Sequence, residues 1–270
     1  MRERVRAEWL RKASTRVHPG IEVHGLAKAF GHVQAVANAS LSVHSGEVVA
    51  LFGDNGAGKS TLLKCACGVL RPDTGVIKVE GQLVSLASVR DAQQLGIDVV
   101  FQDLALAPDL TVAENVFLGH EVYRGRFPHW LGVLDRRHME RRADDTLRSL
   151  GIELPSLDEP VKSLSGGQRQ AVAIARATMW ATSAILFDEP TAALGARQSE
   201  IVMDLVRRTA ERGLAVLVIS HDIPRMLGVA DRLVVMRHGS TVWQSPAEGV
   251  EVTDVVTQMV SGQVAVGGGV

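Results

Sequence analysis

Three short apolar runs, each ending at a polar residue, limit most strongly what this chain can fold into. They are VVALF (48–52), AILF (184–187) and AVLVI (215–219), followed by Gly53, Asp188 and Ser220–His221. Continuous apolar runs of this length are typical of strands that are covered on both faces, as in parallel sheets. Helical patterns separate them, for example residues 198–213, which end at a glycine. The pattern predicts an α/β fold with a mostly parallel sheet, in which the polar residues meet at the carboxyl edge, where ligands bind.

Composition excludes several classes of protein. The 270 residues are 46% hydrophobic with a net charge of −1, which gives no polycationic field and predicts no nucleic-acid partner. No apolar run approaches the roughly 20 residues of a membrane span, and the basic N-terminus does not resemble a secretory signal. Cys65 and Cys67 are two apart on an expected helix, so their side chains point in different directions and a disulfide is implausible, and no further metal ligands lie nearby. We expect two small buried side chains.

The organisation along the chain suggests one large domain with flanking segments. We expect an N-terminal extension (1–19), a single domain (20–250) and a C-terminal tail (251–270). The extension is either poorly ordered or an amphipathic helix, since Val5, Trp9, Ala13 and Val17 recur every four residues. The stretch from about 103 to 160 is rich in charge and has helical periodicity, which predicts a helical subdomain inserted into the α/β core.

Residues 53–60, GDNGAGKS, match the phosphate-loop pattern G-x-x-x-x-G-K-[ST] at every fixed position, between a buried strand and a helix. The glycines let backbone N–H groups point at phosphate oxygens, and the helix start adds its positive dipole end. Lys59 is the expected cation for the β- and γ-phosphates, Ser60 a Mg²⁺ ligand and Thr61 a donor near the α-phosphate. The nucleotide-binding residues expected here are Gly53, Asp54, Asn55, Gly56, Ala57, Gly58, Lys59, Ser60 and Thr61.

Other polar residues at strand ends are candidates for catalysing hydrolysis of a bound nucleotide. Asp188 is expected to hold Mg²⁺ through water, and Glu189 to polarise the attacking water; the alternative is two solvated acids in a turn. The Gln102 amide could contact the metal or the water, and His221 could act nearby. Taken alone, Gln102 could be an ordinary strand-end glutamine and His221 a hydrogen-bonded core histidine.

A second anion site is predicted at SGGQ (165–168). Ser165 and Gln168 have the spacing of a capping box, and Gly166 and Gly167 leave room for close approach to the N–H groups of the helix that follows. This site has no lysine and no metal ligand. It therefore looks like half of a site that completes the nucleotide site of another molecule.

The ordered motifs GDNGAGKST, VVFQD, LSGGQ, ILFDEP and ISHD resemble the ATPase subunit of ATP-binding cassette (ABC) transporters over about residues 20 to 250. The resemblance implies a P-loop NTPase core with an antiparallel β region near the N-terminus. It also implies a head-to-tail dimer with a second copy, in which each ATP–Mg²⁺ lies between one phosphate loop and the other LSGGQ helix. In this dimer Ser165 and Gly167 would contact the γ-phosphate, His221 would position Glu189, and Phe30 would stack on adenine unless it is an ordinary core residue. Gln102 would sense the nucleotide.

Within that family the chain is most similar to ATPases of bacterial monosaccharide importers of the fructose and ribose type, in GDNGAGKSTLLK, residues 96–119 and PTAALGARQ. The resemblance implies a transmembrane permease partner, an extracytoplasmic sugar-binding protein acting indirectly, and a peripheral place on the cytoplasmic face of the inner membrane. Gly195 departs from the aspartate usual after PTAAL, which puts communication across the dimer in doubt. An importer ATPase for an amino acid or another small solute, and a non-transport ABC ATPase, remain as alternatives.

Overall fold

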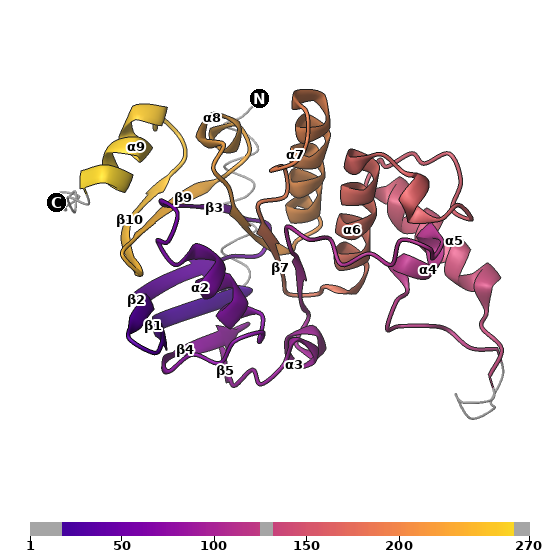
Figure 1. Ribbon diagram of the computed structural model, residues 1–270, viewed down its shortest axis with the longest axis horizontal. Coiled ribbons are helices and arrows are strands. Elements are labelled where there is room, and N and C mark those ends of the chain that lie inside the picture. Colours follow the sequence, from indigo (N-terminus) through magenta and orange to yellow (C-terminus); the bar gives the residue numbers. More distant parts are fainter. Residues whose placement is uncertain (1–17, 125–131, 262–270) are drawn as a thin grey trace.

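Buried strands define the centre of the molecule, and the computed structural model describes residues 18–124 and 132–261 of the chain (Figure 1). Among these residues the strands form one curled sheet in the order β5-β4-β1-β2-β10-β9-β3-β8-β7-β6. The strands are β1 Ile21–Phe30, β2 Val33–Val43, β3 Val48–Phe52, β4 Thr74–Val79, β5 Gln82–Val84, β6 Ile97–Val100, β7 Ala184–Asp188, β8 Ala215–Ile219, β9 Arg232–Arg237 and β10 Ser240–Pro246.

The core of the sheet is parallel: β3 pairs with both β8 and β9, β7 pairs with β8, and β6 pairs with β7. Every residue of β3, β7 and β8 is buried. The three apolar runs therefore form the predicted strands, with β7 one residue longer than the run. The prediction of an α/β fold with a mostly parallel core sheet is confirmed.

Successive residues of β3 enter two different hydrophobic clusters, because side chains alternate across a sheet. Val48, Ala50 and Phe52 pack with buried residues of α6 and α7, whereas Val49 and Leu51 pack with α2 and the antiparallel strands. Figure 1 shows α6 and α7 side by side on one side of the core strands and α2 over β1 and β2. The helices are α2 Lys59–Ala66, α3 Val89–Gln94, α4 Val112–Val116, α5 Arg136–Ser149, α6 Gly166–Trp180, α7 Ala196–Glu211, α8 Ile223–Leu227 and α9 Val252–Ser261, with a short 3₁₀ helix at Val161–Ser163.

The antiparallel strands form a separate layer beside the phosphate loop. β1 pairs antiparallel with β2 and β4, and β4 pairs antiparallel with β5. This layer joins the core sheet where β2 meets β10, at the pair Asn38 and Ser240. It holds the β1–β2 hairpin next to the loop that follows β3, as shown below.

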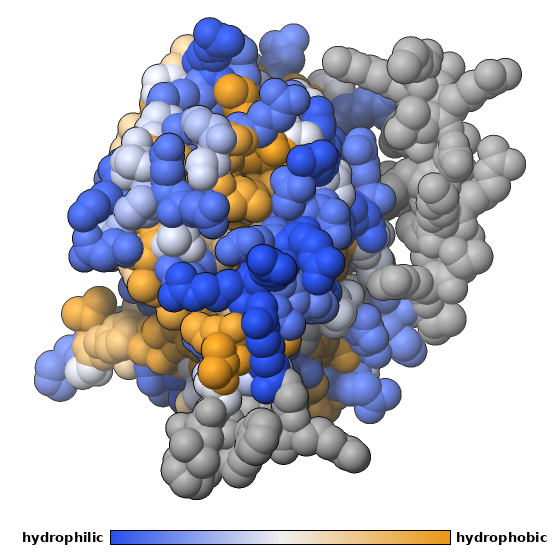
Figure 2. Space-filling model, turned by 90° about the vertical axis from the view of Figure 1, so that its right-hand side faces the viewer, coloured by the Kyte–Doolittle hydropathy of each residue, from blue (hydrophilic) through white to orange (hydrophobic). Residues whose placement is uncertain are grey.

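The described residues of the range 103–160, expected to be helical, contain the helices α4 and α5 and several irregular segments, and they lie with α6 at one end of the molecule (Figure 1). Figure 2 views that end, where hydrophobic side chains gather in areas bordered by hydrophilic ones. Exposed apolar residues between α4 and α5 include Leu118 (42% exposed) and Val133 (70% exposed).

The flanking segments are described only in part. Within the range assigned to the tail, residues 252–261 form α9, with Val255 buried. The two interpretations of the N-terminal extension concern residues outside the described part of the chain. Cys65 and Cys67 are both buried and free, and burial raises the pKa of each thiol to about 11.

Candidate functional site

The phosphate loop connects the end of β3 to the start of α2. Close contacts with neighbouring backbone require glycine at two of its positions. Gly58 has φ +98°, and a Cβ there would lie 2.3 Å from the carbonyl oxygen of Ala35 in β2. A Cβ on Gly53 would lie 2.3 Å from the carbonyl oxygen of Met236 in β9. Larger residues would push these strands away, so glycine keeps the loop close to both neighbours.

Lys59 lies in the position expected for a phosphate-binding cation. The side chain is buried, and its Nζ donates to the carbonyl oxygens of Gly53 (2.7 Å) and Asp54 (3.0 Å). Burial lowers the pKa of Lys59, while the carboxylates of Glu189 and Asp188 favour its charged form. Gly58, the N-cap of α2, makes no side-chain cap hydrogen bond to the first N–H groups of the helix. Loop, cation and helix start together fit a phosphate group.

A hydroxyl and a carboxylate meet beside this loop. Ser60 Oγ donates to Asp188 Oδ1 over 3.2 Å, although the two residues are 128 positions apart in sequence. Burial raises the pKa of Asp188, and the hydrogen bond from Ser60 opposes this effect. Oxygen donors of these two types are the ligands that Mg²⁺ takes in nucleotide sites, so the pair fits that ion.

Gln102, the third predicted metal ligand, lies at the same sheet edge but is not hydrogen-bonded to the pair among the described residues. It follows β6, whose Val100 pairs with Phe187, the residue before Asp188. The side chain is exposed, and no hydrogen bond to Ser60 or Asp188 occurs among the described residues.

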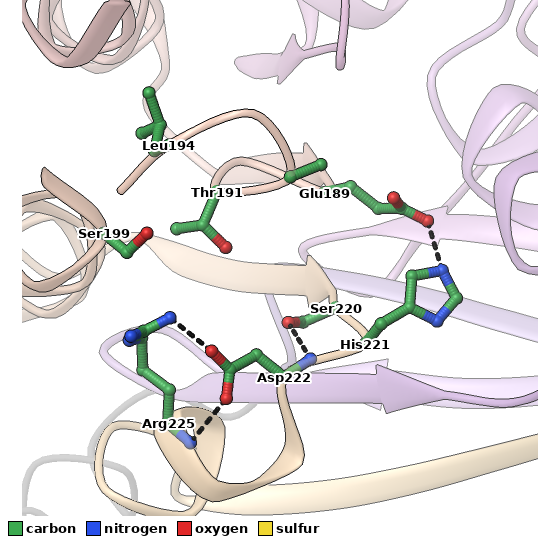
Figure 3. A pocket seen from close by; sticks show the side chains of 9 residues that line it. Glu189, Thr191, Leu194, Ser199, Ser220, His221, Asp222 and Arg225 are labelled. Atoms are coloured by element: carbon green, nitrogen blue, oxygen red, sulfur yellow. Dashed lines mark hydrogen bonds and ion pairs between the residues drawn. The ribbon is translucent and has the colours of Figure 1, made fainter. Parts of the chain in front are cut away.

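Glu189 and His221 form a direct pair at the ends of β7 and β8. His221 Nε2 lies 2.6 Å from Glu189 Oε1 (Figure 3). The His221 side chain is 46% exposed, so it is not a core histidine. Glu189 has φ +52°, in the left-handed region that costs a non-glycine residue on the order of 1–3 kcal/mol. Such strain is typical of functional sites, where the surrounding structure fixes a side chain in one place.

A cavity of about 210 Å³ adjoins this pair (Figure 3), lined by Glu189, Thr191, Ala192, Leu194, Ser199, Ser220, His221, Asp222 and Arg225. Asp222 caps α8 by accepting from the Arg225 backbone N–H (3.1 Å) and also pairs with the Arg225 guanidinium. Its own N–H donates to Ser220 Oγ (3.1 Å). These contacts fix the turn that carries His221. Sequence reasoning missed Arg225, and the only available signal was the aspartate directly after His221.

The helix start that was predicted to be a second anion site has the expected capping box. Ser165 is the N-cap of α6: its Oγ accepts from Gln168 N (3.3 Å), and Gln168 Oε1 accepts from Ser165 N (2.9 Å). A Cβ on Gly167 would lie 3.1 Å from the Gln198 side chain of α7. Among the described residues no hydrogen bond joins this helix start to the phosphate loop.

The structure also shows the surroundings of Phe30 and Gly195, two further residues identified from the sequence. Phe30 ends β1 and is 49% exposed, unlike an ordinary core phenylalanine. Gly195 precedes α7 and has no positive φ, and a Cβ at this position would have no described atom within 4 Å. The structure gives no steric reason for glycine at position 195.

Comparison with known proteins places the motifs in a family. The family described as ABC transporter matches residues 36–192. The chain is 42% identical over 250 residues to the xylose/arabinose import ATP-binding protein of Sulfolobus acidocaldarius, covering 92% of this chain and 97% of that protein. It is 42% identical over 223 residues to the fructose import ATP-binding protein of Rhizobium meliloti, covering 82% and 86%. It also resembles a solved dimer of an ATP-binding cassette bound to ADP and phosphate, with TM-score 0.69 and 27% identity, covering 85% and 100%.

Proposed function

The chain belongs to the ABC transporter family, and we propose that it is the ATP-hydrolysing subunit of an importer whose cargo is a monosaccharide. The family resemblance inferred from the motifs is confirmed, and the nucleotide of an ATP-binding cassette is ATP. The observation that carries the sugar assignment is the near full-length similarity to import proteins named for xylose or arabinose and for fructose. No residue of this chain would contact the sugar.

The phosphate loop and its surroundings would hold ATP with Mg²⁺. The loop N–H groups and Lys59 would bind the β- and γ-phosphates, while Ser60 and Asp188 would hold the metal. When bound, Mg²⁺ would neutralise charge on the phosphate oxygens. The hydrogen bond between Ser60 and Asp188 supports this assignment because it already brings both oxygen donors together at the end of the loop.

Glu189 would act as the general base in hydrolysis. Its carboxylate would accept a proton from the water that attacks the γ-phosphorus, and general bases typically contribute about 10²- to 10⁴-fold in rate. His221 would hold the Glu189 carboxylate in place through the 2.6 Å contact and would also reach the γ-phosphate. The turn fixed by Asp222 and Arg225 supports this positioning of His221.

A second copy of the chain would complete each site. The N-terminus of α6 has the geometry of an anion site, yet no hydrogen bond of the described residues ties it to the phosphate loop of its own chain. A head-to-tail dimer would place Ser165 and Gly167 of one chain against the γ-phosphate on the other. The similarity to a solved dimeric cassette supports this arrangement.

The membrane partners follow from the transport proposal. Within residues 18–124 and 132–261, no helix has the length and apolarity needed to cross a bilayer. A separate permease would therefore carry the cargo, with an extracytoplasmic sugar-binding protein supplying it and this chain bound peripherally at the cytoplasmic face. Leu118 and Val133 are exposed apolar residues between α4 and α5, and the end of the molecule that carries these helices would offer a surface for the permease (Figures 1 and 2).

The decisive experiment is recovery of the tagged chain from gently solubilised membranes, followed by identification of stoichiometric partners. We expect a polytopic permease, and the binding protein that accompanies it should bind pentoses or hexoses in a thermal-shift screen. A binding protein that prefers amino acids would overturn the sugar assignment alone. Recovery of the chain only with ribosomes or DNA would overturn the transport role.

A further inference from the structure

The β1–β2 hairpin brings an exposed aromatic ring next to the phosphate loop. Phe30 is the last residue of β1, and Ala35, just after the turn, has its carbonyl oxygen 2.3 Å from where a Cβ on Gly58 would be. The hairpin therefore rests on the loop through backbone contact. A ring at this place can reach the base of a nucleotide whose phosphates occupy the loop, and base stacking needs a flat, partly exposed ring such as this one.

Lys28 occupies one side of this ring. Residues 28 and 30 are two apart on a strand, so their side chains share a face. Lys28 Nζ lies 5.8 Å from the centroid of the Phe30 ring, within the range of a cation–π contact. The ammonium group thus covers one face of the ring and favours one ring orientation, which leaves the opposite face for a base.

Asp73 holds Lys28 and the end of β1 together. The ladder between β1 and β4 ends at the pair Ala27 and Thr74, beyond which the outer edge of β1 has no strand partner among the described residues. Asp73 replaces that partner: its N–H donates to Ala27 O (2.9 Å) and its Oδ2 accepts from Ala29 N (2.7 Å). Its other oxygen accepts from Lys28 Nζ (2.7 Å).

The Asp73 carboxylate accepts two of these hydrogen bonds although its side chain is 47% exposed. The hydrogen bonds from Lys28 and Ala29 lower the pKa of the Asp73 carboxyl, so it stays ionised across the neutral range. One aspartate therefore fixes three consecutive residues, 27 to 29, directly before Phe30.

We propose that Lys28 and Asp73 are positioning residues that hold the Phe30 ring as the platform for the base of ATP. The inference rests on the proposed nucleotide site. It adds the residues that determine how much of the ATP-binding free energy comes from stacking of the base. Lys28 orients the ring through the cation–π contact, and Asp73 holds both Lys28 and the end of β1 through its hydrogen bonds. Neither residue contacts the phosphates in this assignment.

The test compares ATP with inorganic tripolyphosphate, which has the phosphates but no base, by titration calorimetry on the full chain with Mg²⁺. The readout is the ratio of the two dissociation constants. We expect Phe30→Ala to weaken ATP binding by about five- to a hundredfold, as stacking losses do. Lys28→Met and Asp73→Asn should weaken it by about three- to fivefold. Tripolyphosphate affinity should change by less than about twofold in the Phe30 and Asp73 variants.

Two further variants separate positioning from a general structural effect. Lys28→Arg keeps a cation that stacks on aromatic rings, so it should restore the ratio. Lys28→Met added to Phe30→Ala should leave the ratio where Phe30→Ala set it, because a residue that acts through the ring has nothing left to position. Arg148→Met is the control, since its 2.8 Å pair with Asp144 lies on the exposed face of α5.

Specific results would overturn the proposal. Equal weakening of ATP and tripolyphosphate by Lys28→Met would show a charge effect on the phosphates. A further drop in the ratio in the double variant would show that Lys28 acts without Phe30. If Phe30→Ala leaves the ratio unchanged, the platform itself is wrong although ATP still binds. Wild-type protein that binds no ATP would instead refute the proposed function.

Discussion

A buried carboxylate at the amino end of β3 lets the stability of this fold be perturbed without touching the nucleotide site. Glu47 is 2% exposed and accepts from His44 N (2.7 Å) and from Arg232 Nε (2.7 Å) and Nη2 (3.2 Å), with His44 Nδ1 at 3.1 Å. Arg232 also donates to Gln244 Oε1 (2.9 Å) and to the carbonyl of Ser42. The cluster joins β2, β3 and β9, so it ties the antiparallel layer to the parallel core.

The variant Glu47→Gln keeps the shape and removes the charge. Breaking a buried ion pair by removing one partner typically costs about 3–5 kcal/mol, because the other charge stays buried. Arg232 is 20% exposed and keeps its bonds to Gln244 and Ser42, so part of that cost is avoided. We expect the free energy of unfolding to fall by about 2 kcal/mol at pH 7. The exposed pair Arg148–Asp144 should contribute about 0.5 kcal/mol or less, which makes Asp144→Asn the control.

The effect should depend on pH in a defined direction. Burial alone would raise the pKa of Glu47, but hydrogen bonds from His44 and Arg232 outweigh it and leave the pKa below its ordinary value of 4.5. A lowered folded-state pKa stabilises the protein above the unfolded pKa, and this contribution is lost as the pH falls through the folded pKa. The difference between wild type and Glu47→Gln should therefore be full at pH 7 and shrink below about pH 4.5.

Urea unfolding at several pH values measures this difference, in which the titrations of groups that do not contact Glu47 cancel. A difference below about 0.5 kcal/mol at pH 7 would mean that the buried pair behaves like a surface pair. A difference that stays constant from pH 7 to pH 3.5 would refute the charge-based explanation. ATP affinity should not change, because Glu47 lies at the end of β3 opposite the phosphate loop.

Three other predictions concern the nucleotide site and the thiols. Gly58→Ala should weaken ATP binding at least about tenfold, since its Cβ would meet the Ala35 carbonyl at 2.3 Å and φ is +98°; unchanged affinity in calorimetry would show that the loop can shift freely. Glu189→Gln should lower kcat by about 10²- to 10⁴-fold in a phosphate-release assay while ATP still binds, and should dimerise with ATP in light scattering; near-normal turnover would remove Glu189 from its role. Cys65 and Cys67, with pKa values of about 11, should resist a thiol reagent at pH 7.5 until urea is added; rapid labelling of native protein would contradict their burial.

The sequence predicted the parts of the fold that local patterns determine. Continuous apolar runs identified β3, β7 and β8, because strands buried on both faces need apolar residues throughout. The Ser165–Gln168 spacing predicted a capping box, since that motif involves only residues within one turn. Parallel packing then implied that Asp188 and Ser60 share one sheet edge, and their side chains do meet.

Contacts that depend on long-range register were not accessible from the sequence. Asp73 contacts Lys28 and Ala29 only because the β1–β4 ladder stops at Ala27, and nothing near position 73 signals where that ladder ends. The pair between Glu47 and Arg232 spans 185 positions and depends on the order of β2, β3 and β9 in the sheet. Spacing rules describe neighbours in sequence, so such bonds need the topology first.

The two ends of β3 have different roles: the residue at its amino end stabilises the fold, and the loop at its carboxyl end belongs to the nucleotide site. At its amino end Glu47 links three strands through buried ionic bonds, and at its carboxyl end Gly53 begins the phosphate loop. The five buried residues between them pack into both hydrophobic clusters, so the strand is held on both faces along its length. Sites more than about 7–10 Å apart that share no partners usually act independently, and the five residues of β3 separate its two ends by more than that. Loss of the Glu47 charge should therefore lower the unfolding free energy and leave ATP affinity intact, whereas Gly58→Ala in the loop should weaken ATP binding.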